Sequence, residues 1–283
     1  MTINFRNSLF FYFGFLLLAF SAGAKEKPLN LLFFGNSFTA GSGGKEAVAL
    51  NGVPGLVKEI AIAAGHDAPN VQKSVSGGKT LEWHVANNTK TIREPNQLAK
   101  LKQEIIWDYV VMQEQSLRPT DPQGEKYKFG RPDLFIQYAH ELYGKVKEHS
   151  PEVKVILYET WARHSTKPGF YPTPFKDPAT FQAQLRKNYT AAAENINKKT
   201  QSSVAVMAPA GDAWEALGFP LELYAGDRYH AGNQGSLLNA LVIYRVIYGG
   251  KVSCLNLTGL GNQLKIKEED LKKLKTAADS VLK

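Results

Sequence analysis

Segments that look like strands alternate with segments that look like helices along most of the sequence. The short apolar or β-branched segments are residues 29–34, 71–76, 109–113, 153–158 and 203–208. The longer segments with apolar residues at helical spacing are residues 55–64, 81–91, 133–149, 178–199 and 232–248. Repeated alternation of this kind predicts a parallel sheet whose two faces are both covered by helices. We therefore expect an α/β protein, a three-layer α/β/α sandwich around a central parallel sheet of about five strands.

The chain of 283 residues shows no internal repeat and no low-complexity linker, so we expect a single domain over residues 25–283. Its formal net charge is +8, but the lysines and arginines are spread along the sequence. The sequence contains no dense basic block interleaved with aromatic residues, the pattern typical of nucleic-acid binding. We therefore expect no nucleic-acid partner.

The first 24 residues have the pattern of a cleavable signal peptide. Arg6 precedes an almost unbroken apolar run at residues 9–20, and Ala22-Gly23-Ala24 supplies the small residues of a signal-peptidase site. The alternative is a membrane anchor, but the run is shorter than the roughly 20 residues that span a bilayer. We expect a secreted or periplasmic protein with no stable membrane insertion after cleavage. The single Cys254 cannot form an intramolecular disulfide, and we expect it to be a buried, small apolar residue.

A serine lies on a glycine turn directly after the first predicted strand, in Gly35-Asn36-Ser37-Phe38-Thr39. In open parallel sheets, ligands bind beyond the carboxyl ends of the strands, where this turn is expected. The nearby glycines fit neither a dinucleotide fingerprint nor a phosphate-binding P-loop. Thr39 stands where a G-x-S-x-G nucleophile elbow needs glycine. The remaining interpretation is a serine nucleophile of another design.

A serine nucleophile needs a base, and the sequence contains six histidines. His230 stands out because Asp227, three residues earlier, can bond one ring nitrogen and leave the other for a serine hydroxyl. The alternative is an aspartate that caps the next helix beside a solvent-exposed histidine. We expect His84, His140 and His149 on exposed helix surface. No histidine has a partner at the spacing of a zinc site, so we expect no metal.

The two motifs together resemble those of the SGNH (GDSL-like) hydrolases. Gly35-Asn36-Ser37 follows the first predicted strand, and Asp227-x-x-His230 precedes the last long apolar helix. The resemblance extends over about residues 29–248 and implies the SGNH hydrolase fold, with a flavodoxin-like central sheet. It also implies a catalytic triad formed by the serine, the aspartate and the histidine, with no cofactor.

The resemblance further implies an oxyanion hole with three donors. The first is the N–H group of Ser37, and the second is a backbone N–H in the stretch after the second strand, where Gly77 is preferred over Gly78. The third donor in this family is normally an asparagine side chain after the third strand. This sequence has no such asparagine, and Gln113 is the nearest amide, one methylene longer. The sequence thus resembles a variant with glutamine in that place.

Substrate choice is indicated only weakly. Trp161 and Arg163 follow the fourth predicted strand, and an aromatic plane beside a guanidinium suits a sugar ring or a carboxylate. The alternative is a tryptophan that packs under its loop and an arginine in a salt bridge. We expect a secreted serine esterase acting on a small-molecule or glycan ester, with an acetyl group on a carbohydrate favoured. The alternatives are a lipase or thioesterase of the same superfamily, and a non-catalytic glycan-binding protein that keeps the fold.

Overall fold

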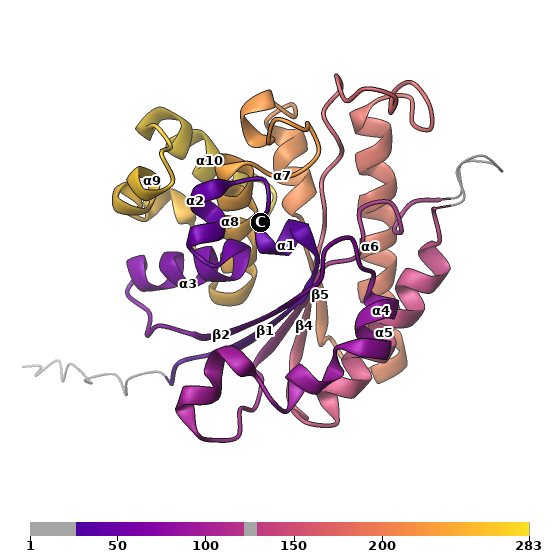
Figure 1. Cartoon of the computed structure of the whole chain (residues 1–283), viewed down its shortest axis with the longest axis vertical. Helices are drawn as coiled ribbons and strands as arrows, with labels where there is room; N and C mark the ends of the chain where they lie inside the picture. The colour runs from indigo at the N-terminus through magenta and orange to yellow at the C-terminus, as the bar shows by residue number, and fades with distance from the viewer. Residues whose placement is uncertain (1–26, 122–128, 283) are drawn as a thin grey trace, which may run out of the picture.

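Five parallel strands form the centre of the protein (Figure 1). The computed structural model describes residues 27–121 and 129–282. The strands are β1 (Asn30–Gly35), β2 (Asn70–Val75), β3 (Tyr109–Met112), β4 (Lys154–Tyr158) and β5 (Ala205–Ala208). They pair in the order β2-β1-β3-β4-β5, and each pair is parallel. This is the flavodoxin-like order, with its switch point between β1 and β3, so the predicted sheet is confirmed.

Strand β1 shows why the sheet needs a layer on each face. All six of its residues are buried, and successive side chains point to opposite faces. Leu31 and Phe33 belong to an apolar cluster shared with the helices of one layer, whereas Leu32 and Phe34 belong to a second cluster shared with the other. Each such side chain contributes roughly 1.5–3 kcal/mol relative to exposure to water. A continuous apolar strand is therefore stable only when it is covered on both sides.

The helices form two layers around the sheet (Figure 1). One layer contains α1 (Ser37–Ala40), α2 (Lys45–Ala49), α3 (Gly52–Ala63), α7 (Ala210–Ala216), α8 (Asn233–Tyr248), α9 (Thr258–Gln263) and α10 (Glu268–Ser280). The other contains α4 (Leu81–Asn87), α5 (Pro132–Lys147) and α6 (Pro178–Thr200). Short 3₁₀ turns occur at Thr89–Ile92, Asn96–Leu101, Leu221–Leu223 and Val252–Cys254. The three-layer sandwich is thus confirmed.

The sequence pattern missed the shortest helices. Helices α1, α2, α7 and α9 contain four to seven residues each. One or two turns do not reveal a helical period, because too few residues repeat on one face. Helices α3, α5, α6 and α8 match predicted segments, with no boundary shifted by more than three residues. Helix α4 is the largest exception, because it ends at Asn87 whereas the pattern extended to residue 91.

Three burial predictions were wrong. Cys254 is exposed, at the end of a 3₁₀ turn in which Val252 fills the core instead. His84 is fully buried and His149 is nearly so, although both were expected on exposed surface. His149 is stable in this position because its ring Nε2–H donates to the carbonyl oxygen of Ile105 at 2.9 Å. A histidine with a backbone partner can enter the interior, and the helical pattern does not show such partners.

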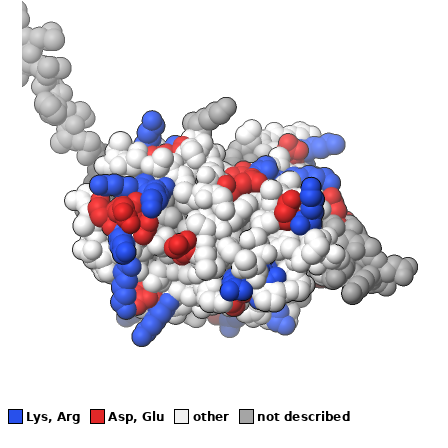
Figure 2. Space-filling model, turned by 90° about the horizontal axis from the view of Figure 1, so that it is seen from above, with Lys and Arg blue, Asp and Glu red and all other residues white. Residues whose placement is uncertain are grey.

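The predicted signal peptide at residues 1–24 lies outside the described residues. Within residues 27–121 and 129–282, no helix combines the length and the apolar character needed to cross a membrane. Figure 2 shows the face seen from above the view of Figure 1, where lysines and arginines are mixed with acidic residues around broad uncharged areas. On this face the net positive charge of the chain does not gather into one continuous patch.

Candidate active site

Ser37, Asp227 and His230 lie together beyond the carboxyl end of β1. The Ser37 Oγ lies 2.9 Å from His230 Nε2, and His230 Nδ1 lies 2.6 Å from Asp227 Oδ2. A carboxylate only accepts hydrogen bonds, so Nδ1–H donates to Asp227. In the neutral imidazole Nε2 then carries no proton and accepts the hydroxyl hydrogen of Ser37. The arrangement can therefore move a proton from the serine hydroxyl to the histidine ring.

The loop that carries Asp227 and His230 is fixed by its own hydrogen bonds. Asp227 Oδ1 accepts the backbone N–H of Tyr229 at 3.0 Å and that of His230 at 2.9 Å. Partial burial alone would raise the pKa of Asp227, but the bonds from the His230 ring and from both N–H groups lower it below its usual value. The aspartate is thus held in its charged form. The side chains stay accessible, with 25% of His230 and 40% of Asp227 exposed.

The turn that carries Ser37, here called the serine turn, consists of residues 35–39 and begins with Gly35. Any larger residue at position 35 would force its neighbours to move. A Cβ atom at Gly35 would lie 2.2 Å from Thr39 Oγ1 and 2.7 Å from Gln113 Oε1. Asn36 then caps helix α1, because its Oδ1 accepts the N–H of Phe38 at 3.1 Å. Ser37 is the first residue of this helix, where a backbone N–H has no intrahelical acceptor. The chain therefore turns tightly and leaves the serine at the start of a helical turn.

Trp161 does not present a face to substrate, contrary to the prediction. It is only 1% exposed and stacks on Phe38, with ring centroids 4.3 Å apart, and on Trp214, at 4.5 Å. Its Nε1–H donates to the Tyr229 carbonyl oxygen at 3.1 Å. The tryptophan is buried because both of its ring faces are covered by aromatic neighbours. It connects the residue after Ser37 to the residue before His230, so it helps to set their separation.

Arg163 lies between two aromatic rings. Its guanidinium carbon is 4.1 Å from the ring centroid of Phe170 and 4.5 Å from that of Tyr229. Burial lowers the pKa of Arg163 from its usual value. The salt bridge considered from the sequence is not among its contacts in the described residues. Its contact with substrate stays a prediction, while its observed contacts stabilise the position of Tyr229.

Gly77 and Gly78 form an exposed turn after β2. Gly78 has a φ of +67°, and a Cβ atom at either glycine would meet nothing within 4 Å. The Asn36 side chain donates from Nδ2 to the carbonyl oxygen of Lys79 at 3.1 Å, which ties this turn to the serine turn. The open space beside Gly77 leaves room for a substrate group. Its role as an oxyanion donor stays a prediction.

Gln113 follows β3, as expected, but its side chain is fully buried. Its Oε1 accepts the N–H of Asn36 at 3.0 Å and the hydroxyl of Thr39 at 2.9 Å. Its amide nitrogen donates to the backbone carbonyl of Glu114. Both ends of the amide thus have protein partners. The predicted role of Gln113 as an oxyanion donor gains no support from these contacts.

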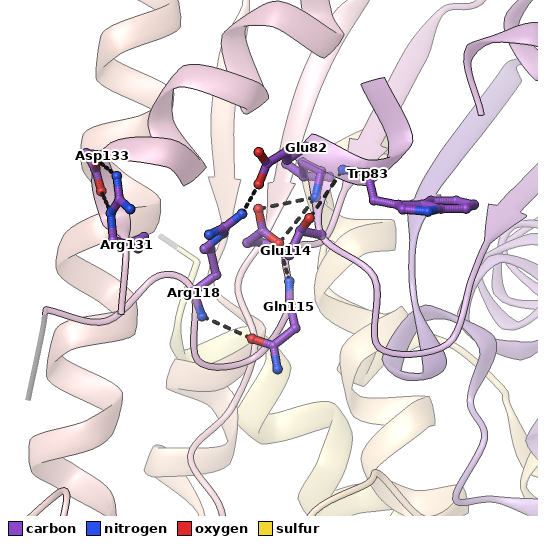
Figure 3. Close-up of polar contacts among 9 residues, drawn as sticks. Glu82, Trp83, Glu114, Gln115, Arg118, Arg131 and Asp133 are labelled. Atoms are coloured by element: carbon purple, nitrogen blue, oxygen red, sulfur yellow. Dashed lines mark hydrogen bonds and ion pairs between the residues drawn. The ribbon is translucent and has the colours of Figure 1, made fainter. Parts of the chain in front are cut away.

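Glu114 is a buried carboxyl group that sequence reasoning missed (Figure 3). One of its oxygens accepts the N–H of Gln115 at 2.5 Å, and both lie 3.3 Å from the N–H of Leu81, the first residue of α4. Burial raises its pKa to about 7. Beside it, Arg118 forms an ion pair with Glu82. Its position two residues after β3, at the carboxyl edge of the sheet, is the signal that could have identified it.

The comparisons with known proteins found similar structures but no similar sequence among family models or curated proteins. A candidate SGNH hydrolase from Slackia heliotrinireducens is 24% identical with a TM-score of 0.55, over 78% of this chain and 100% of that one. A DUF4886 family protein from Bacteroides uniformis is 18% identical with a TM-score of 0.60, over 90% and 95%. The fold is that of the SGNH hydrolases. A lipase/acylhydrolase from Enterococcus faecalis shares this SGNH fold at 18% identity and a TM-score of 0.50, over 78% and 96%.

Proposed function

We propose that this protein hydrolyses esters with Ser37 as its nucleophile. The observation that carries the proposal is the continuous chain of hydrogen bonds from Ser37 through His230 to Asp227. His230 takes the hydroxyl proton as Ser37 Oγ attacks the ester carbonyl carbon, and then gives it to the leaving alcohol. Water next attacks the acyl-enzyme by the same route, which releases the acid and restores the serine. Asp227 holds the ring and stabilises its positive charge.

The oxyanion formed in each step needs donors near Ser37. The proposed donors are the N–H groups of Ser37 and Gly77, which the family resemblance implies and which lie on two turns tied together through Asn36. Similar folds include a lipase/acylhydrolase, which supports ester chemistry for this architecture. The proposed mechanism requires no metal or cofactor.

A fluorophosphonate probe tests the proposal directly, because it phosphonylates only an activated serine. The purified protein should be labelled at Ser37 and should hydrolyse p-nitrophenyl acetate. Ser37→Ala should abolish labelling and lower kcat by roughly 10⁴-fold or more, with the melting temperature unchanged. The exposed Ser42, on the next turn, gives a matched control, since Ser42→Ala should keep both activities. A folded protein that resists labelling and binds glycans would instead be the non-catalytic alternative.

We further propose an acyl group on a carbohydrate, most simply acetyl, as the substrate. The partly exposed triad side chains and the exposed turn at Gly77 suit a bulky polar alcohol better than a lipid chain, which needs a covered apolar channel. Trp161 no longer supports this choice, but the partly exposed Trp83 offers another aromatic face. Its indole points away from Glu114 (Figure 3), and Lys79 Nζ of the neighbouring turn lies 5.8 Å from the centroid of its ring. The proposed export of the protein is consistent with such a substrate.

A comparison of esters tests this substrate class. Acetylated glycans and p-nitrophenyl acetate should be hydrolysed much faster than p-nitrophenyl esters of long-chain acids. Trp83→Ala should raise KM for the glycan by roughly two- to tenfold, the range of one aromatic contact, and leave p-nitrophenyl acetate unaffected. A preference for long chains would favour the lipase alternative.

N-terminal sequencing of the exported protein should place its first residue at Lys25, which tests cleavage after residue 24.

A further inference from the structure

One peptide unit, between Gly35 and Asn36, is held by side chains from two other elements. Its carbonyl oxygen lies 2.8 Å from His84 Nε2 of helix α4 and also accepts the N–H of Ser76 at 3.1 Å. Its N–H donates to Gln113 Oε1, directly after β3, at 3.0 Å. The next peptide unit along the chain joins Asn36 to Ser37. Both of its polar atoms are therefore fixed from outside the serine turn.

The hydrogen-bond chemistry fixes the state of His84. A carbonyl oxygen only accepts, so Nε2 must carry a proton and donate to Gly35. The other nitrogen, Nδ1, lies 3.1 Å from the Asn88 amide nitrogen, which only donates, so Nδ1 is unprotonated. The ring is thus neutral with a defined tautomer. Consistent with this, burial lowers its pKa to about 4.

The same reasoning fixes the orientation of Gln113. The N–H of Asn36 must meet an acceptor, so Oε1 and not Nε2 faces it. The Thr39 hydroxyl donates to the same oxygen at 2.9 Å, from inside helix α1. The amide nitrogen meets the Glu114 carbonyl, an acceptor. A reversed amide would place donor against donor at Asn36 and acceptor against acceptor at Glu114.

We propose that His84 and Gln113 are positioning residues that clamp the Gly35–Asn36 peptide and thereby hold Ser37 Oγ in line with His230. This inference rests on the proposed function of Ser37. Rotation of the peptide swings the following residue, and the Ser37–His230 bond of 2.9 Å has little tolerance for such a movement. A misplacement of about 1 Å at a reacting group can cost roughly 10²-fold in rate. Gln113 acts here through its oxygen, as an acceptor, and not as an oxyanion donor.

Paired substitutions separate this clamp from a donor role. Gln113→Glu keeps an acceptor oxygen toward Asn36, and in its protonated form its hydroxyl can still donate to Glu114. It should keep kcat within roughly threefold of the wild type, whereas Gln113→Ala should lose roughly 10–100-fold in kcat with KM unchanged. His84→Gln places an amide nitrogen where Nε2 was and should keep most activity. His84→Phe keeps the shape without the donor and should lose roughly tenfold or more.

Rates are expressed per site titrated with the fluorophosphonate, because a purely structural defect removes active molecules without changing kcat per site. If Gln113→Glu is as slow as Gln113→Ala, the rate depends on the side-chain N–H group of Gln113 and not on its oxygen. The clamp is then wrong. If His84→Phe turns over at the wild-type rate per site, His84 does not position Ser37.

Amide hydrogen exchange, measured by NMR, gives a readout that does not depend on hydrolysis. The Asn36 N–H should be protected in the wild type and in Gln113→Glu, and should exchange roughly tenfold faster or more in Gln113→Ala. Equal exchange in all three proteins overturns the clamp even if hydrolysis is observed. The exchange rates can also follow the expected pattern while the wild type is neither labelled by the fluorophosphonate nor able to hydrolyse esters. That result refutes the proposed function and leaves the clamp geometry intact.

Discussion

The two halves of the site are built in opposite ways. The serine half is interior, since Asn36 is 3% exposed and both Gln113 and His84 are fully buried. The histidine half is open, with 25% of the His230 side chain and 40% of the Asp227 side chain exposed. Side-chain hydrogen bonds from distant elements fix the first half. Local backbone bonds and aromatic stacking fix the second.

The difference matches what each half has to do in the proposed reaction. A nucleophile gains from a fixed position, because its attack depends on distance and angle. A base that later delivers a proton to a leaving alcohol must stay within reach of substrate and water. Buried hydrogen bonds are stronger than exposed ones and more costly to break. The fold therefore places its buried polar network behind the serine and leaves the histidine on a loop.

The largest expected effect is the loss of rate when His230 or Asp227, in the open half of the site, is replaced. His230→Ala should lower kcat/KM by roughly 10⁴-fold or more, and Asp227→Ala should cost roughly 10–100-fold less than that, because the aspartate acts through the ring. The double variant should be no slower than His230→Ala, since the two act as one unit. Steady-state kinetics on p-nitrophenyl acetate measures this. His140→Ala, on helix α5, is the matched control and should leave the rate unchanged. A double variant in which the losses of the two single variants multiply would contradict the shared role.

A smaller effect is expected on the free energy of unfolding. It comes from the buried carboxyl group of Glu114, the residue after Gln113. The pKa of this carboxyl is raised from 4.5 to about 7 by burial, so between these values the folded state binds more protons than the unfolded state. Its contribution to the free energy of unfolding therefore falls as pH rises from about 4.5 to 7, by on the order of 3 kcal/mol. Glu114→Gln should remove this fall, and should be more stable than the wild type at pH 8.

Urea unfolding at pH 5 and pH 8 checks the Glu114 prediction. Glu94→Gln is the matched control, because Glu94 is an exposed carboxylate paired with Lys90 and should leave the difference between the two pH values unchanged. A Glu114→Gln protein with the pH dependence of the wild type would show that Glu114 is ionised in the folded state at both pH values.

The smallest expected effect concerns Arg163, in the open half. Removal of the guanidinium from between Phe170 and Tyr229 should loosen the loop that ends at His230. Arg163→Ala should lower kcat by roughly tenfold with KM unchanged, within the range of one desolvated cation–π contact. Arg163→Lys should not restore the rate, because an ammonium cannot stack as a plane. A raised KM with normal kcat would instead assign Arg163 to substrate, as the sequence suggested.

The sequence by itself determined the sheet and the location of the three central residues. Alternating apolar strands and periodic helices leave few arrangements that bury both faces of a parallel sheet, so β1 to β5 could be recognised. Ser37 and His230 are 193 residues apart, yet each lies in a short local motif beside a predicted element. Carboxyl ends of parallel strands meet at one edge, so such motifs can be expected to meet there.

Only the tertiary structure decided which polar and aromatic side chains turn inward. Trp161 comes soon after the end of β4, where a side chain could face a substrate, but Phe38 and Trp214 cover both faces of its ring. His84 lies on a helix with exposed positions, yet it is buried because the Gly35 carbonyl is within its reach. The sequence placed Gln113 at the site but did not show that its oxygen faces Asn36. Periodicity reveals which face of an element is apolar, whereas the partner of a buried polar group comes from a distant part of the chain and exists only once the elements have packed.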